Sequence, residues 1–356
     1  MNQTKNILIT GGAGFIGGTL IEKLLEERNY KIYNIDNLGY ASNELRLKNF
    51  KKIHKNYHHF NIDISDNENL KKAILESDPD LIFHLAAESH VDRSIDNPFH
   101  FIKSNIIGTF NLLEASTTHF QKLSKDRKID FKFLHISTDE VFGSLGSKGK
   151  FNEHSKYKPN SPYSATKASS DHLVRAWFHT YSLPTLITNC SNNYGPYQFP
   201  EKLIPLTILK AINGQKIPVY GKGENIRDWL HVKDHIEALL LVAKSGKIGK
   251  TYCIGGNSEI KNIKLVKSIC EYLDSYLPKS EGTYLDQIEF VKDRPGHDFR
   301  YSIDTNLIEQ ELNWKAKIKF EDGIKSTINW YLNNEYWSEY AINKSGYKGE
   351  RLGLDN

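Results

Sequence analysis

Short apolar runs alternate with longer amphipathic stretches along the first third of the chain, which is typical of strand–helix–strand units in a parallel sheet. The polar segment 117–130 is expected to be a lengthened connection. We therefore expect an α/β fold of the Rossmann type, with a doubly wound parallel sheet. The predicted strands cover 7–10, 31–35, 81–85 and 131–137, and the predicted helices cover 15–27, 70–77 and about 98–116.

The pattern changes after about residue 189, where Gly and Pro become frequent and the helical runs become shorter. A smaller C-terminal lobe is expected there. An apolar helix pattern after Asp234 indicates that the chain passes back to the first sheet. The predicted division is a cofactor-binding domain over 1–190, with returning segments near 225–255, and a substrate-binding lobe over 191–356.

Composition narrows the class of protein only slightly. Of the 356 residues, 39% are hydrophobic and 25% are charged, and 47 Lys and Arg nearly balance 43 Asp and Glu, so nothing requires a nucleic-acid partner. Cys190, Cys253 and Cys270 are too scattered for a disulfide framework or a Cys-based zinc site, which favours a reducing compartment.

The sequence shows neither a signal-peptide pattern nor an apolar run long enough to span a bilayer. We therefore expect a cytoplasmic protein without a membrane partner. His84, His90 and His231 do not form a spaced metal set, so no metal is expected and these residues are interpreted as packing or surface residues.

A glycine cluster over 11–17 lies between the first predicted strand and the first predicted helix. Gly12, Gly14 and Gly17 fit the dinucleotide-binding spacing, and Gly11, Gly14 and Gly17 fit the looser spacing of short-chain dehydrogenases. Glycine is needed because a pyrophosphate must approach backbone N–H groups at the helix N-terminus, where a β-carbon would block contact. Glycines also serve ordinary turns, so the cluster alone is weak evidence.

Asp36 strengthens this interpretation, because it ends the second predicted strand about twenty residues beyond the glycines. A carboxylate there binds the ribose hydroxyls and repels a 2′-phosphate, which favours NAD over NADP. The alternative is a strand-end aspartate that only caps a turn.

Ser161 and Pro162 begin a predicted helix that places Tyr163 and Lys167 one turn apart on the same face. A Lys ammonium close to a phenol favours the phenolate and lowers a pKa that is otherwise near ~10, as a general base requires. The alternative is an incidental pair on an exposed helix.

Thr138, Asp139 and Glu140 follow a predicted strand at the edge where open α/β sheets bind ligands. In an enclosed cleft, burial and mutual repulsion would raise the pKa of at least one of the two carboxyl groups, which provides a proton donor and a proton acceptor. The alternative is an acidic strand end that faces water.

With these motifs in place, the sequence resembles the dTDP-glucose 4,6-dehydratases, a family of NAD-dependent extended short-chain dehydrogenases. The Thr-Asp-Glu triplet is the most specific element. Phe142 stands where the family usually has Tyr, which leaves one hydrogen bond in doubt, and Ser104 replaces a usual Thr. The segments that carry the resemblance are 10–17, 85–92, 137–143, 163–167, 189–205, 220–230, 293–301 and 330–337.

The resemblance implies that Tyr163 takes the proton of the glucose 4-hydroxyl while hydride leaves C4 for the nicotinamide, helped by Thr138 and Lys167. Glu140 would then remove the C5 proton while Asp139 protonates the departing 6-hydroxyl. Return of the hydride to C6 and of a proton to C5 would complete a net loss of water.

The resemblance also implies two sets of binding residues. The set for NAD is Gly11, Gly14, Phe15, Ile16, Gly17, Asp36, Asn37, Leu38, Asp63, Ile64, Leu85, Ala86, Ala87, Ser104, Tyr163, Lys167 and Asn193. The set for the nucleotide sugar is Ser89, Thr138, Asn192, Lys202, Leu203, Pro218, Val219, Tyr220, Arg227, Asn262, Arg294 and His297.

The chemistry of three of these side chains suits a nucleotide. The guanidinium groups of Arg227 and Arg294 give paired donors for a pyrophosphate, and Tyr220 offers a ring for a base. The alternatives are that Tyr220 belongs to the core and that Arg227 forms a surface ion pair with Asp228.

Three other functions remain open at this point: a dehydratase of a CDP- or UDP-linked hexose, a 4-epimerase, and a nucleotide-sugar-binding relative without catalysis. The resemblance further implies a homodimer that pairs through the helices beginning near Pro98 and Ser161. Rhamnose is the commonest destination of such a product.

Overall fold

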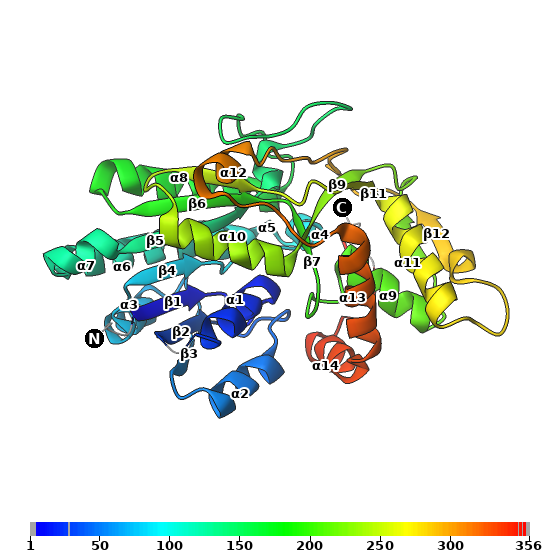
Figure 1. Cartoon of the computed structure of the whole chain (residues 1–356), viewed down its shortest axis with the longest axis horizontal. Helices are drawn as coiled ribbons and strands as arrows, with labels where there is room; N and C mark the ends of the chain where they lie inside the picture. Colours follow the sequence, from blue (N-terminus) through cyan, green and yellow to red (C-terminus); the bar gives the residue numbers. More distant parts are fainter. Residues whose placement is uncertain (1–4, 28, 348, 351, 354–356) are drawn as a thin grey trace.

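The computed structural model describes residues 5–27, 29–347, 349–350 and 352–353. Its centre is a seven-stranded sheet in which every neighbouring pair is parallel, in the order β10-β6-β5-β4-β1-β2-β3 (Figure 1). Successive strands are added on one side of β1 as far as β3 and then on its other side from β4 onward, as in a doubly wound fold. The predicted fold class is confirmed. The strands are β1 Lys5–Thr10, β2 Tyr30–Asp36, β3 Tyr57–Asn61, β4 Leu81–His84, β5 Lys132–Thr138, β6 Thr185–Cys190 and β10 Thr251–Ile254.

Helices cover both faces of this sheet because alternate strand residues point to opposite faces. Ile7 and Ile9 pack with α1, α10 and α12, whereas Leu8 packs with α3, α6 and α8. The first layer is α1 Phe15–Leu25, α10 Val232–Ser245 and α12 Asn306–Leu312; the second is α3 Asn67–Ser77, α6 Thr109–Lys122 and α8 Pro162–Tyr181.

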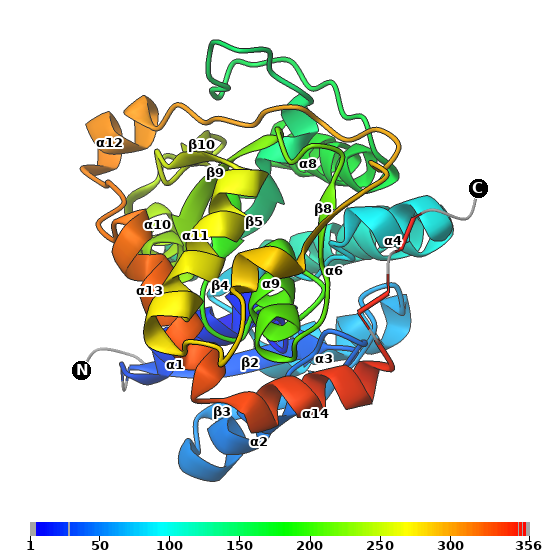
Figure 2. The same cartoon turned by 90° about the vertical axis from the view of Figure 1, so that its right-hand side faces the viewer.

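The rest of the chain builds a second lobe around its own core, to the right of the sheet in Figure 1 and toward the viewer in Figure 2. Its small sheets have the orders β11-β9-β7 and β12-β8. The strands are β7 Asn192–Tyr194, β8 Ile217–Tyr220, β9 Ile226–His231, β11 Glu259–Lys261 and β12 Ile288–Val291. The helices are α9 Leu203–Ile212, α11 Asn262–Tyr276, η3 Tyr284–Gln287, α13 Phe320–Leu332 and α14 Glu335–Ser345.

The helix predicted near 98–116 is longer and less regular than expected. It runs through α5 Pro98–Phe101, the π-helix η1 Ile102–Gly108 and α6, which follows α4 Val91–Asp96. The lengthened connection predicted over 117–130 is wrong, because α6 continues to Lys122 and α7 covers Lys125–Asp130. Phe120 packs on Phe131 with ring centroids 5.4 Å apart, so the segment has apolar anchors that its polar composition hid. The pattern also missed β3, β6 and β10 of the large sheet and α2 Glu44–Ile53.

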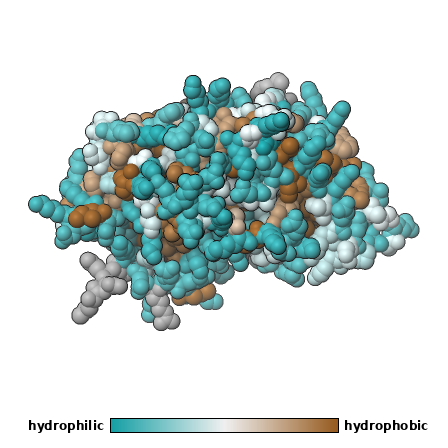
Figure 3. Space-filling model, turned by 45° about the horizontal axis from the view of Figure 1, so that its top comes forward, coloured by the Kyte–Doolittle hydropathy of each residue, from teal (hydrophilic) through white to brown (hydrophobic). Residues whose placement is uncertain are grey.

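The face of the molecule in Figure 3 is largely hydrophilic, with small separate hydrophobic areas. Among the described residues, no helix is both long and apolar enough to cross a bilayer.

Candidate active site

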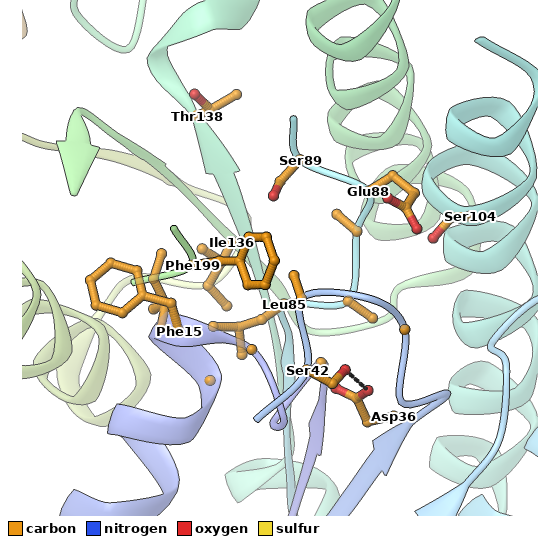
Figure 4. A pocket seen from close by; sticks show the side chains of 18 of the residues that line it. Phe15, Asp36, Ser42, Leu85, Glu88, Ser89, Ser104, Ile136, Thr138 and Phe199 are labelled. Atoms are coloured by element: carbon orange, nitrogen blue, oxygen red, sulfur yellow. Dashed lines mark hydrogen bonds between the residues drawn. The ribbon is translucent and has the colours of Figure 1, made fainter. Parts of the chain in front are cut away.

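Two adjoining cavities open where the parallel strands end, and together their volumes of about 340 and 210 Å³ suit a ligand of appreciable size. The glycine-loop cavity, lined by Gly11, Gly14, Gly17 and Asp36, lies against the N-terminus of α1 (Figure 4). The arginine cavity contains Arg227 and Arg294 and lies toward the second lobe. Both cavities are lined by Ser89, Glu140, Asn192, Asn193, Gln198, Glu201 and Lys202.

The glycine loop has the form that a dinucleotide pyrophosphate requires. Gly11 has a φ of +76°, and a β-carbon there would lie 2.7 Å from the backbone nitrogen of Ala86. A β-carbon on Gly17 would lie 2.3 Å from the carbonyl oxygen of Gly11. Helix α1 begins directly after Gly14, which has no side chain to cap its first N–H groups. The residues present therefore fit a dinucleotide, held by backbone N–H groups at a helix N-terminus.

Asp36 is buried at the end of β2 and faces the glycine-loop cavity. One of its carboxylate oxygens accepts the N–H of Ala13 (2.9 Å), and the other accepts the N–H of Leu38 (2.9 Å) and the hydroxyl of Ser42 (3.1 Å; Figure 4). Burial raises the pKa of Asp36, while these three donors lower it. The carboxylate both shapes the loop and faces the cavity, so the turn-capping alternative describes part of its role.

Replacing Gly17 with alanine tests the fit of the loop. The added β-carbon must displace the Gly11 carbonyl, and overpacking of this kind costs about 1–3 kcal/mol, which corresponds to NAD binding about 5- to 150-fold weaker. Titration calorimetry of the purified variant with NAD measures this. Gly146→Ala is the matched control, because its β-carbon meets nothing within 4 Å. Equal NAD affinity in the two variants would contradict the assignment of the loop.

The Thr-Asp-Glu triplet is enclosed and does not face open water. Asp139 is 1% exposed, and its Oδ1 accepts the hydroxyl of Thr138 (3.3 Å). Burial, followed by the charge of Glu140, raises the pKa of Asp139 well above its usual range. Burial also raises the pKa of Glu140, whereas Arg294 and Arg227 lower it. At neutral pH this favours a protonated Asp139 beside the carboxyl group that faces both cavities, so the water-facing alternative is wrong.

The expected pairing of Tyr163 with Lys167 differs in detail. Both side chains are buried on α8, but Lys167 Nζ donates to the carbonyl of Ile136 (2.9 Å). The pKa of Tyr163 lies well above its ordinary value, chiefly because of burial and then the charge of Glu140. The lowered pKa predicted from the helical spacing is therefore wrong for the protein alone, since spacing does not report the carboxylates that other elements bring to the phenol.

The arginine cavity is lined by two positively charged side chains, Arg227 and Arg294. Arg227 lies with its guanidinium carbon 4.4 Å from the ring centre of Tyr301 and donates to the carbonyl of Asp298 (3.0 Å). Arg294 pairs with Asp92 (2.5 Å), which also accepts the hydroxyl of Tyr220 (3.0 Å). The surface ion pair considered for Arg227 is thus wrong, because this side chain is buried.

The structure brings most of the predicted site residues to these two cavities. All predicted cofactor residues except Leu38 line the glycine-loop cavity, and all predicted substrate residues except Thr138 line the arginine cavity. Leu38 instead packs against the sheet core, and Thr138 lies in the glycine-loop cavity. Asp139 lines neither cavity. Among the described residues, no cluster of His, Cys, Asp and Glu has the form of a metal site.

Sequence reasoning missed many residues of these cavities, and four of them make polar contacts that shape the site. Ser42 holds Asp36, and Asp92 holds Arg294. Glu201, which lines both cavities, accepts the Tyr40 hydroxyl (2.8 Å) and pairs with Arg93 (2.8 Å), whereas Gln198 donates to the carbonyl of Asn193. A sequence signal existed for three of them, since Asp92, Gln198 and Glu201 fall inside two of the segments that carry the resemblance.

Comparisons with known proteins agree with this geometry. A family model described as GDP-mannose 4,6 dehydratase matches residues 8–327. A probable dTDP-glucose 4,6-dehydratase from Sinorhizobium fredii is 51% identical over 348 residues, which cover 98% of each chain.

Two solved structures resemble the whole chain. The dTDP-glucose 4,6-dehydratase from Bacillus anthracis, in complex with NAD, is 42% identical with a TM-score of 0.83, covering 95% of this chain and 99% of its own. The dTDP-glucose 4,6-dehydratase from Streptomyces venezuelae with NAD bound is 38% identical with a TM-score of 0.85, covering 94% and 99%. The resemblance drawn from the motifs is confirmed.

Proposed function

This chain belongs to the nucleotide-sugar 4,6-dehydratases, and within them to the dTDP-glucose 4,6-dehydratases, and from this premise we propose how its two cavities act. The chain converts dTDP-glucose to dTDP-4-keto-6-deoxyglucose and water. NAD occupies the glycine-loop cavity and the nucleotide part of the substrate occupies the arginine cavity. The observation that carries this proposal is that the two cavities meet at Glu140, with Tyr163 on the cofactor side.

When bound, NAD supplies a hydride acceptor for C4 of the sugar and later the hydride donor for C6. Tyr163 takes the proton of the 4-hydroxyl, and the hydroxyl of Thr138, which borders the same cavity, orients that oxygen. Lys167 supplies a fixed positive charge behind the phenol. These three side chains therefore act on the oxygen at C4.

Glu140 and Asp139 act on the next bond. The C4 ketone makes the C5 proton acidic, and Glu140, facing both cavities, removes it. A proton returns to C5 when the hydride reaches C6, which completes the product. Asp139 is kept protonated by burial and by the charge of Glu140, so it provides the proton for the departing 6-hydroxyl. Asp139 itself lines neither cavity, and its Oδ1 accepts the hydroxyl of Thr138 (3.3 Å), which lines the glycine-loop cavity.

The two buried arginines bind the pyrophosphate. Replacing Arg227 with methionine is expected to raise KM about 10- to 100-fold with kcat changed less, because a charged hydrogen bond contributes about 1.5–3 kcal/mol. Steady-state kinetics with dTDP-glucose measure this. Lys264→Met is the control, since it removes one positive charge from the exposed surface of α11 in the same lobe. An equal rise of KM in the two variants would show that long-range attraction of the substrate, and not contact with Arg227, is responsible for the rise.

The reaction itself is tested by incubating the purified protein with dTDP-glucose without added reductant. We expect a 4-keto product that absorbs in alkali and has lost water by mass. Turnover of only a CDP- or UDP-linked hexose would keep the mechanism and change the substrate. Formation of an isomer alone would indicate a 4-epimerase, and inertness with NAD bound would indicate a non-catalytic relative.

Three further properties belong to this proposal. The protein acts in the cytoplasm, in a pathway that leads to dTDP-rhamnose. It forms a homodimer, which is supported by exposed apolar side chains on α5, η1 and α6: Phe99, Ile102, Ile107 and Phe110. The first 190 residues with the returning α10, β10 and α12 form the cofactor-binding domain, and the rest forms the nucleotide-sugar lobe.

A further inference from the structure

A buried carboxylate lies directly behind the residues that act at C4. Asp171 is on α8, one turn beyond Lys167, and is fully buried. Its Oδ2 accepts the hydroxyl of Tyr157 (2.6 Å) and the amide of Asn189 (3.1 Å), and its Oδ1 lies 3.2 Å from Nε2 of His135. An ionised carboxylate this deep in a protein needs a compensating positive charge.

Lys167 is the positive charge in the same place. The residue is 4% exposed, and its ammonium donates to the carbonyl of Ile136 (2.9 Å). Burial lowers the pKa of Lys167, and Asp171 is the first group that raises it again. Cys190 is the other contributor, but burial raises the pKa of its thiol to about 12, so it is neutral at neutral pH. Asp171 is therefore the negative charge that opposes the desolvation of Lys167.

The other titratable groups around Asp171 and Lys167 do not replace the negative charge of Asp171. Burial, followed by Lys167, lowers the pKa of His135 to about 4, and burial lowers that of His84 well below its usual value, so both rings are neutral at neutral pH. Burial raises the pKa of Asp171, but His135, Lys167 and Tyr157 outweigh it and hold the pKa at about 2. The groups that face the cluster are His84 on β4, His135 on β5, Cys190 on β6, Tyr157 before α8, and Tyr163 and Arg175 on α8.

We propose that Asp171 is a positioning residue whose negative charge keeps Lys167 protonated behind Tyr163. Through Asn189, which also donates to the carbonyl of Thr138 (3.0 Å), it fixes α8 against the strands that carry the catalytic groups. This inference rests on the proposed function. It adds a residue to the account of Tyr163 and Lys167. Lys167 keeps its positive charge because Asp171, on the next turn of the same helix, stays ionised.

The pH dependence of Asp171→Asn tests this inference. Without the negative charge, the pKa of Lys167 falls, so the ammonium is lost at a lower pH. The alkaline decline of kcat is therefore expected to move about one to three pH units toward neutrality. Tyr157→Phe is the matched control, because it removes a hydrogen bond to the same carboxylate but leaves the charge, and its alkaline limb is expected to stay in place. An unmoved limb in Asp171→Asn, or an equal movement in both variants, would overturn the inference.

Unfolding measurements test the same pair without activity. Asp171→Asn is expected to lower the denaturation midpoint in the wild-type background and to lower it less, or not at all, when Lys167 is already methionine. If Asp171→Asn alone does not fold, the double variant is expected to fold, since it leaves no unpaired buried charge; its failure as well would contradict the inference. If the wild-type protein turns over no nucleotide sugar, the proposed function fails and this cycle still decides whether the two charges are coupled.

Discussion

Replacing Tyr163 with phenylalanine is expected to lower kcat by about 10²- to 10⁴-fold, because positioned proton transfer contributes that much. The phenol is buried, so phenylalanine keeps its packing and removes only the hydroxyl that takes the C4 proton. NAD content and the midpoint of thermal unfolding are expected to change little. Product formation from dTDP-glucose, followed by alkali-induced absorbance, measures the loss.

Tyr40→Phe is the matched control for this experiment. Tyr40 also lines the glycine-loop cavity, but its hydroxyl donates to Glu201 (2.8 Å) and lies outside the proposed proton path. A loss of less than about tenfold is expected, in line with one ordinary hydrogen bond of about 1 kcal/mol. If Tyr163→Phe keeps more than a tenth of the wild-type rate, another group takes the C4 proton.

Glu140→Gln is expected to lower kcat about 10²- to 10³-fold while the first step at C4 survives. Glutamine keeps the shape of the side chain but cannot accept the C5 proton, so exchange of that proton with deuterated water stops. Reduced nicotinamide is then expected to accumulate, which its absorbance reports. Burial raises the pKa of Glu140. In the wild-type protein kcat therefore falls as the pH drops through this pKa, because the base becomes protonated. The glutamine variant is expected to lack this acidic limb of the pH profile.

Asp139→Asn separates the two carboxyl groups. Because Asp139 provides a proton to the leaving 6-hydroxyl, its asparagine variant should also be slow, yet C5 exchange should continue. Exchange that survives in Glu140→Gln and stops in Asp139→Asn would reverse the two assigned roles.

Much of the fold was predictable because the local signals agree with the global architecture. The glycine run, the strand-end Asp36 and the apolar periodicity of the first third each predict the same β1–α1–β2 unit, and the structure has it. One of the strands that were missed, β3, carries a weak pattern. β3 reads Tyr-His-His-Phe-Asn, whose histidines look polar although the strand pairs with β2 in the sheet.

Much of the candidate site was also predictable, but its contacts were not. The sequence places Tyr163 and Lys167 one turn apart, yet the partner of Lys167 is a carbonyl on β5, a neighbour set by tertiary packing. Asp92 and Arg294 lie about two hundred residues apart and pair only because α4 and the segment after β12 meet at one cavity. No local pattern in a single sequence reports such a meeting.

The most direct test of the central claim is to follow the hydrogen at C4. We would incubate the purified protein with dTDP-glucose carrying deuterium at C4 and locate the label in the product by mass spectrometry and NMR. The account predicts a dehydrated 4-keto product with deuterium in the C6 methyl group, because the hydride that leaves C4 would return to C6 of the same sugar. Deuterium retained at C4 of an isomer, or a dehydrated product without the label, would contradict it.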